Sequence, residues 1–122
     1  MAIQDLKQRI FLFAVAVGNL VKELPYNAVN REYFHQVIRS SASVGANYRA
    51  ARRAKSDADF LNKLKIVEEQ VDESVYFLEL LLVVNPDHEQ IITPLINEGT
   101  EILKIIVASI VTARTKINQS KK

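Results

Sequence analysis

Apolar residues recur at alternating steps of three and four along most of the chain. In the first part of the sequence these residues are Ile3, Leu6, Ile10, Phe13, Val17, Leu20 and Leu24. Residues three or four apart lie on one face of an α-helix, so this spacing predicts a helix with one buried seam. Pro25 follows the last of these residues, and proline lacks the backbone N–H that a helix interior needs. We therefore expect the first helix at about residues 2–24.

Three further segments carry the same spacing and predict three more helices. They cover about residues 31–55, residues 57–85, and a last stretch that begins at residue 87 or 93 and ends near residue 118. The start of the last helix stays open, because Thr93 and Pro94 suit a helix start whereas Asp87 permits an earlier one with an irregularity at Pro94. Four amphipathic helices joined by short links predict an all-α fold. We expect an antiparallel up-down-up-down four-helix bundle, with residues 1–122 as a single domain.

Capping residues locate two of the helix starts. Asn30 has the side-chain acceptor of an N-cap and precedes the second helix. Ser56, with Asp59 three residues later, resembles a capping box that opens the third helix.

Apolar residues also lie outside the main seams. They are Phe11, Leu12, Val15, Ile66, Phe77, Leu80, Val84, Ile105, Val107 and Val111. A helix that is apolar on several sides is buried on several sides, and a single chain of 122 residues has little to bury them against. Scattered apolar surface residues are the alternative, and they are common. Because these residues cluster, we favour a homo-oligomer.

The composition excludes several kinds of chemistry. The chain has no cysteine, so disulfides, thiolate metal sites and cysteine nucleophiles are excluded. His35 and His88 are the only histidines, and neither has a serine and an acid arranged around it. Glu32 and His35 form one Glu-x-x-His pair of a di-metal bundle, but the second pair is missing and this one points away from the predicted core. We expect no catalytic residue, no metal and no cofactor, and therefore no enzyme.

Neither apolar stretch predicts a membrane span. Residues 11–21 are too short to cross a bilayer and lack a following cleavage site, and residues 102–113 are also short and contain Lys104. We expect a soluble, cytoplasmic chain without a membrane partner.

The second helix carries small residues on one stripe. Ser40, Ser43, Asn47, Ala50 and Ala54 recur there at steps of three and four. Small side chains let two helices approach closely, so we interpret Ser40, Ser43 and Asn47 as helix-packing or oligomer contacts. The acidic residues Glu68, Glu69, Asp72 and Glu73 of the third helix are candidates for the same role. Antiparallel pairing would let these carboxylates accept hydrogen bonds from Ser43 or Asn47, or pair with an arginine of a neighbouring subunit.

Basic residues gather at the end of the second helix. The candidates for phosphate contact are Arg49, Arg52, Arg53 and Lys55. The planar guanidinium suits phosphate geometry, although a net charge of only +2 does not by itself argue for nucleic acid. The alternative is a solvated face, or ion pairs with the acidic third helix. No glycine-rich phosphate loop, RNP-type aromatic motif or helix-turn-helix spacing supports base readout.

Residues 39–74 resemble the signature of the four-helix-bundle family named for the 23S rRNA intervening sequence, also known as S23-type ribosomal proteins. The matching residues are Ser40, Ser41, Ser43, Val44, Ala46, Asn47, Phe60, Glu68, Glu69, Asp72, Glu73 and Ser74. One common form of the signature continues "ANIAEG" after the serines, whereas this chain reads "ANYRAARR" and is more basic there.

The resemblance implies a closed ring of bundles with five subunits as the expected count, and no known enzyme activity. Some relatives are encoded within inserts in ribosomal RNA genes. A related branch, the accessory variability protein of diversity-generating retroelements, binds a reverse transcriptase and nucleic acid through a basic surface. We therefore expect a non-enzymatic ring that binds RNA or DNA through backbone phosphates. The alternative is a protein–protein adaptor that docks a larger enzyme such as a reverse transcriptase, without contact to nucleic acid.

Overall fold

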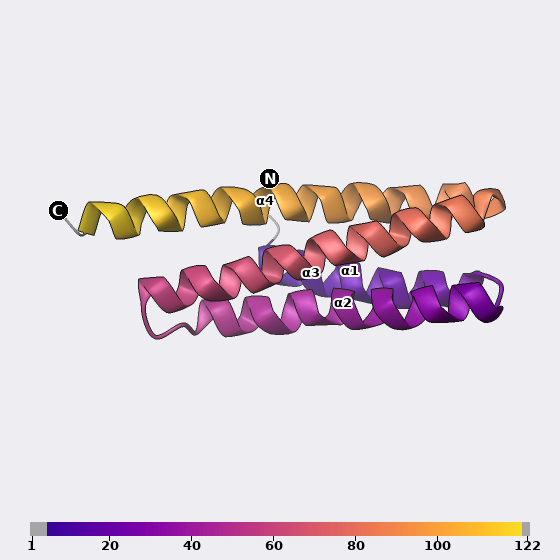
Figure 1. Cartoon of the computed structure of the whole chain (residues 1–122), viewed down its shortest axis with the longest axis horizontal. Coiled ribbons are helices and arrows are strands. Elements are labelled where there is room, and N and C mark those ends of the chain that lie inside the picture. The colour runs from indigo at the N-terminus through magenta and orange to yellow at the C-terminus, as the bar shows by residue number, and fades with distance from the viewer. Residues whose placement is uncertain (1–4, 121–122) are drawn as a thin grey trace.

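The computed structural model describes residues 5–120, which form four antiparallel α-helices (Figure 1). They are α1 (Leu6–Glu23), α2 (Ala28–Arg52), α3 (Asp57–Val84) and α4 (Glu89–Ser120), with a turn of 3-10 helix, η1 (Pro86–His88), before α4. Each helix packs against its neighbours in the chain, and α4 returns to lie beside α1. The predicted all-α four-helix bundle is confirmed, and the described residues include no strand.

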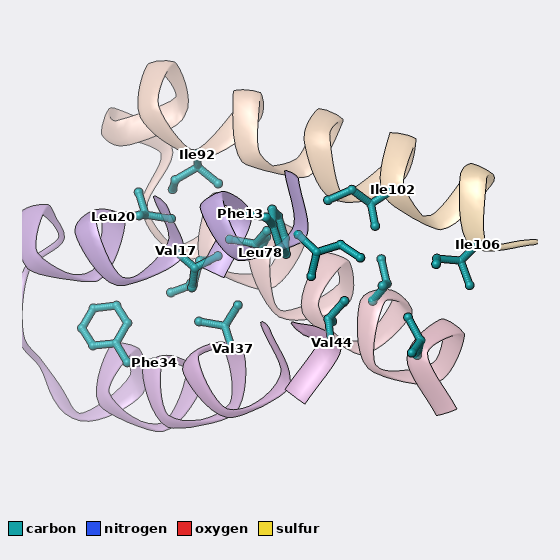
Figure 2. Close-up of a cluster of buried hydrophobic side chains, with 14 of the residues drawn as sticks. Phe13, Val17, Leu20, Phe34, Val37, Val44, Leu78, Ile92, Ile102 and Ile106 are labelled. Atoms are coloured by element: carbon teal, nitrogen blue, oxygen red, sulfur yellow. The ribbon is translucent and has the colours of Figure 1, made fainter. Parts of the chain in front are cut away.

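The seams predicted from the sequence form one core. Figure 2 shows side chains of the four helices directed into a common interior. Its labelled residues are Phe13, Val17, Leu20, Phe34, Val37, Val44, Leu78, Ile92, Ile102 and Ile106, all of them buried. Each apolar side chain of this size stabilises the fold by about 1.5–3 kcal/mol when it leaves water, so the periodic seam accounts for the association of the helices.

The start of α2 corrects the sequence prediction. The N-cap is Asn27, whose Oδ1 accepts a hydrogen bond from the Asn30 backbone N–H at 2.9 Å. Asn30 is buried inside the first turn, where its amide exchanges hydrogen bonds of 2.8 and 2.9 Å with the amide of Asn85 at the end of α3. Asn30 was the wrong cap because its side chain is held by a residue far away in the sequence.

Two other predicted helix ends differ from the structure. α2 ends at Arg52 rather than residue 55, because Ser56 takes the extended backbone of an N-cap and residues 53–56 form the link. α1 begins at Leu6 after its N-cap Asp5, whereas the predicted first helix began at residue 2; residues 2–4 lie outside the described part of the chain.

The starts of α3 and α4 follow the capping chemistry more closely. Ser56 Oγ accepts a hydrogen bond from the Asp59 N–H at 3.1 Å, as predicted, while Asp59 Oδ2 accepts one from the Lys55 N–H instead of from Ser56. α4 begins at Glu89, two residues after the earlier predicted start, because Asp87 lies in η1. The helix runs through Pro94 without a break, so the irregularity expected there is absent.

The helices differ in length, and this leaves the bundle open at one end. α1 has 18 residues and α4 has 32. Figure 1 shows α4 continuing past the start of α1, alongside the first half of α3. The uncovered faces of α3 and α4 line a largely apolar hollow of about 550 Å3. Residues around it include Asp57, Phe60, Ile105, Ala108, Thr112 and Lys116.

Most of the apolar residues that lie outside the main seams are exposed in the single chain, as their positions around the helices predicted. Phe11, Leu12, Val15, Ile66, Val84, Val107 and Val111 each expose 40% or more of their surface. Phe77, Leu80 and Ile105 are half-buried. Across residues 5–120, no helix combines the length and apolarity needed to cross a membrane.

Candidate nucleic-acid interface

A cluster of basic side chains lies where α1 begins and α2 ends. The two helices are antiparallel, so the first turn of α1 is beside the last turns of α2. Lys7, Arg49, Arg52 and Arg53 line one hollow of about 490 Å3, and all four residues are exposed. We call these four residues the basic cluster.

Lys7 is the member of the basic cluster that the sequence analysis missed. Ile10 and Gly45 lie side by side, since a Cβ added to Gly45 would be 3.5 Å from Ile10 Cγ2. One helical turn toward the end of the bundle then brings Lys7 beside Arg49. The short link between α1 and α2 could have predicted this neighbour, because a short link determines which turns of two antiparallel helices lie side by side.

The basic cluster keeps most of its charge unpaired within residues 5–120. Arg52 Nη1 lies 3.7 Å from Asp5 Oδ1, and both side chains are more than half exposed, so this ion pair contributes little. No described carboxylate forms an ion pair with Lys7, Arg49 or Arg53. The sequence analysis left open that the basic residues form ion pairs with the acidic third helix. These three residues form no such ion pair within residues 5–120.

Lys55 lies apart from the basic cluster, in the link between α2 and α3. It lines a neighbouring hollow that also contains Arg52, Asp57 and Phe60. Its backbone N–H donates to Asp59 Oδ2 at 3.1 Å. Of the four predicted phosphate contacts, the structure thus brings three together and leaves Lys55 at the edge.

The small-residue stripe is occupied by contacts within one chain. Ser40 is buried against α3, where its Oγ lies 2.9 Å from Ser74 Oγ. The Asn47 amide donates to the Ser43 carbonyl and hydroxyl, at 2.9 and 3.0 Å. Within the described residues, the hydrogen bonds expected from Ser43 and Asn47 to carboxylates are not formed, and the Asn47 amide bonds to Ser43 of its own helix instead.

The four acidic residues of α3 that were candidates for packing or oligomer contacts divide into one paired and three unpaired side chains. Glu73 forms an ion pair with Arg39 of the same chain. One expectation was that it would pair with an arginine of a neighbouring subunit. Glu68 is half-buried, while Glu69 and Asp72 are exposed, and none of the three has an ion pair within the described chain. Arg39 therefore faces α3 and does not extend the basic cluster.

Among the described residues, Arg9 and Asp59 have shifted pKa values, and both lie outside the basic cluster. Hydrogen bonds of 2.7 and 2.8 Å from Arg9 to Glu98 raise the pKa of the Arg9 guanidinium. A hydrogen bond from Lys63 and another from the Lys55 backbone lower the pKa of the Asp59 carboxyl. Both shifts favour the charged form, so these residues fix helices in place and do not supply proton transfer near neutral pH.

Metal-ligand types do not gather in the described chain. Residues 5–120 contain no group of three or more histidine, aspartate or glutamate side chains placed to hold a metal ion. Glu32, the partner of His35 in the Glu-x-x-His pair, is exposed, and its Oε1 lies 3.2 Å from Nη2 of Arg31.

Comparison with known proteins places this geometry in a family context. The family model described as "23S rRNA-intervening sequence protein" matches residues 4–108. A solved structure from Bacteroides thetaiotaomicron VPI-5482, described as a protein of unknown function from the S23 ribosomal protein family, is 36% identical to this chain. The match covers 87% of this chain and 98% of that one, with a TM-score of 0.75. Comparison with curated protein sequences gives no match.

Proposed function

The chain belongs to the 23S rRNA-intervening sequence protein family, and we propose that it is a non-enzymatic, oligomeric bundle that binds RNA or DNA through backbone phosphates. One observation carries the proposal. Four exposed cationic side chains surround a single hollow, and three of them have no ion-pair partner in the described chain. Arginine forks and a lysine ammonium are the groups that proteins use to bind phosphate oxygens.

The same arrangement defines the mode of binding. Phosphate contacts fix a protein on a nucleic acid without reading its sequence. Every subunit of a homo-oligomer would carry one basic cluster, so a long strand would bind several clusters at once and gain avidity. We therefore expect tight binding at low salt, with weak sequence preference.

Reversing two charges tests this function. Arg49→Glu combined with Arg53→Glu should weaken binding of a fluorescent RNA or DNA by more than about tenfold at low salt. Each phosphate contact adds about 0.7–0.9 to the slope of log affinity against log salt, so the loss of two contacts should lower the slope by about 1.4 to 1.8. Fluorescence anisotropy over a series of KCl concentrations measures both quantities.

The control must carry the same change in net charge. Lys22→Glu combined with Arg114→Glu reverses two exposed cations at other places on the surface, and it should change the affinity much less. An equal loss of affinity in both double variants would mean that only the net charge matters and that the basic cluster is not the binding site. An unchanged affinity after Arg49 and Arg53 are reversed would overturn the proposal.

A specific observation supports an adaptor as the second candidate. The apolar hollow between the first half of α3 and the second half of α4 has the size of a side-chain-binding pocket, with Phe60 and Ile105 in its wall. Such a hollow suits an apolar anchor of a larger protein partner. If the purified chain binds neither RNA nor DNA at low salt, the adaptor becomes the preferred function.

A further inference from the structure

A second hollow adjoins the basic cluster. It has a volume of about 290 Å3 and lies between α1 and α2. Its residues are Lys7, Phe11, Ala14, Ala42, Gly45, Ala46 and Arg49. Lys7 and Arg49 also line the hollow of the basic cluster, so cationic and apolar surfaces are continuous there.

Side-chain size creates this hollow. Lys7, Phe11 and Ala14 follow one face of α1 at steps of four and three, which places them in a row. The facing row of α2 has only alanine and glycine before Arg49. Phe11 therefore lies at the edge of a shallow slot and exposes 51% of its surface. An exposed phenylalanine beside two unpaired cations is left unexplained by the packing of the bundle.

We propose that this slot receives an unstacked base of a single-stranded nucleic acid, with the base against Phe11 and the neighbouring phosphate on Lys7 and Arg49. The inference rests on the proposed function and specifies its ligand class. Single-strand binding combines a cationic track with aromatic side chains on which bases stack, and it tolerates any sequence because every base has a flat π-face. A duplex keeps its bases paired and stacked, so it would contact the cations alone.

The cations beside the slot favour a base with its phosphate over an uncharged side chain of a protein segment. A protein helix, about 10–12 Å across with its side chains, would lie over this hollow and insert one side chain into it. In this proposal one planar base lies beside Phe11, over a floor of alanine and glycine. The two adjacent cations match the charge of the phosphate that accompanies each base.

Tryptophan fluorescence tests the slot directly, because the chain contains no tryptophan. Phe11→Trp places a single reporter at the slot. Leu12→Trp is the matched control, since Leu12 is 44% exposed but does not line the hollow. Oligo(dT) should quench the fluorescence of the Phe11→Trp variant strongly and that of the Leu12→Trp variant little. A duplex of equal length should quench neither.

Affinity gives the second measurement. Phe11→Ala should weaken oligo(dT) binding about 5- to 20-fold, with duplex binding unchanged. Ala42→Leu should have the same effect by filling the slot, because residue 42 is exposed and its substitution keeps every charge. Light scattering of each variant checks that the subunit count is retained.

The outcomes separate this inference from the function on which it rests. If the wild-type chain binds neither oligo(dT) nor duplex, phosphate binding itself fails. If both bind but Phe11→Ala and Ala42→Leu weaken them equally or not at all, the slot takes no base and phosphate binding stands. A smaller subunit count in Phe11→Ala would assign the slot to contacts between copies of the chain and would overturn the inference.

Discussion

Two glycines show how strongly the effect of one methyl group depends on its place in the bundle. Gly99 is buried where α4 approaches α3 and α1, and an added Cβ would lie 2.8 Å from Val75 Cγ2 and 3.3 Å from Phe13 Cζ. Gly18 is also inside a helix, but an added Cβ there would have nothing within 4 Å. Both positions carry the same helix-propensity cost of glycine, so only packing distinguishes them.

We predict opposite signs for the two alanine substitutions. Gly99→Ala should destabilise the fold by about 1–3 kcal/mol, because overpacking a rigid site outweighs the gain in helix propensity. Gly18→Ala should stabilise it by about 0.5–1 kcal/mol through that propensity alone. Urea unfolding at one fixed protein concentration measures both changes. A stabilised Gly99→Ala variant would mean that α3 and α4 separate easily at this point.

The buried pair Asn30 and Asn85 marks the limit of what single residues reveal in a sequence. Asn27 and Asn30 both have the chemistry of an N-cap, and nothing nearby in the sequence distinguishes them. The choice is made by Asn85, which lies 55 residues away and exchanges two hydrogen bonds with the Asn30 amide, while that amide also donates to the Pro25 carbonyl. Local signals therefore predict that a helix starts here, but only the tertiary contact decides at which residue.

At the scale of helices, the start of α3 depends on a small network of charges. Asp59 accepts hydrogen bonds from Lys63 Nζ at 2.7 and 2.8 Å and from the Lys55 N–H at 3.1 Å. These contacts lower the pKa of Asp59 below its ordinary value of 3.8. A group whose pKa is lowered by folding contributes stability above its unfolded-state pKa and loses it as the pH falls through the folded-state pKa.

Asp59→Asn should therefore be less stable than the wild-type chain at pH 7, with the difference shrinking as the pH falls below 3.8. Urea midpoints measured from pH 7 down into this acid range give the comparison. Asp72→Asn is the control, since Asp72 is exposed on the same helix and has no ion pair in the described chain. A gap between Asp59→Asn and wild type that stays constant with pH would contradict the charge-based explanation.

The pairing of helices explains which part of the candidate site was predictable. Arg49, Arg52 and Arg53 belong to one run of sequence, so their clustering follows from helical geometry alone. Lys7 comes from another helix and joins them only because the α1–α2 pair has a particular register. Lys55 follows Arg53 closely in the sequence, yet the end of α2 at Arg52 turns it toward a different hollow. Periodicity thus predicts faces of helices, whereas a site depends on which turns meet.

At the scale of the whole molecule, the bundle leaves much apolar surface uncovered. α1 is too short to cover the second half of α4, and exposed apolar residues such as Ile66, Val107 and Val111 remain on α3 and α4. Monomeric proteins seldom expose clustered apolar surface of this kind, which usually marks a contact with another molecule. Family resemblance suggests a closed ring of five copies, and a ring would cover equivalent faces on every subunit.

We predict that the purified chain forms a single closed homo-oligomer, with five as the expected subunit count. Burial of apolar faces between copies links folding to association, so the unfolding temperature should rise with protein concentration. Multi-angle light scattering gives the mass, and thermal unfolding over a hundredfold range of concentration gives the linkage. The two measurements should agree, because a monomeric protein would unfold at a temperature that does not depend on protein concentration. A monomer in both measurements would leave the exposed apolar residues of α3 and α4 available to a different partner, and would remove the avidity on which tight phosphate binding depends.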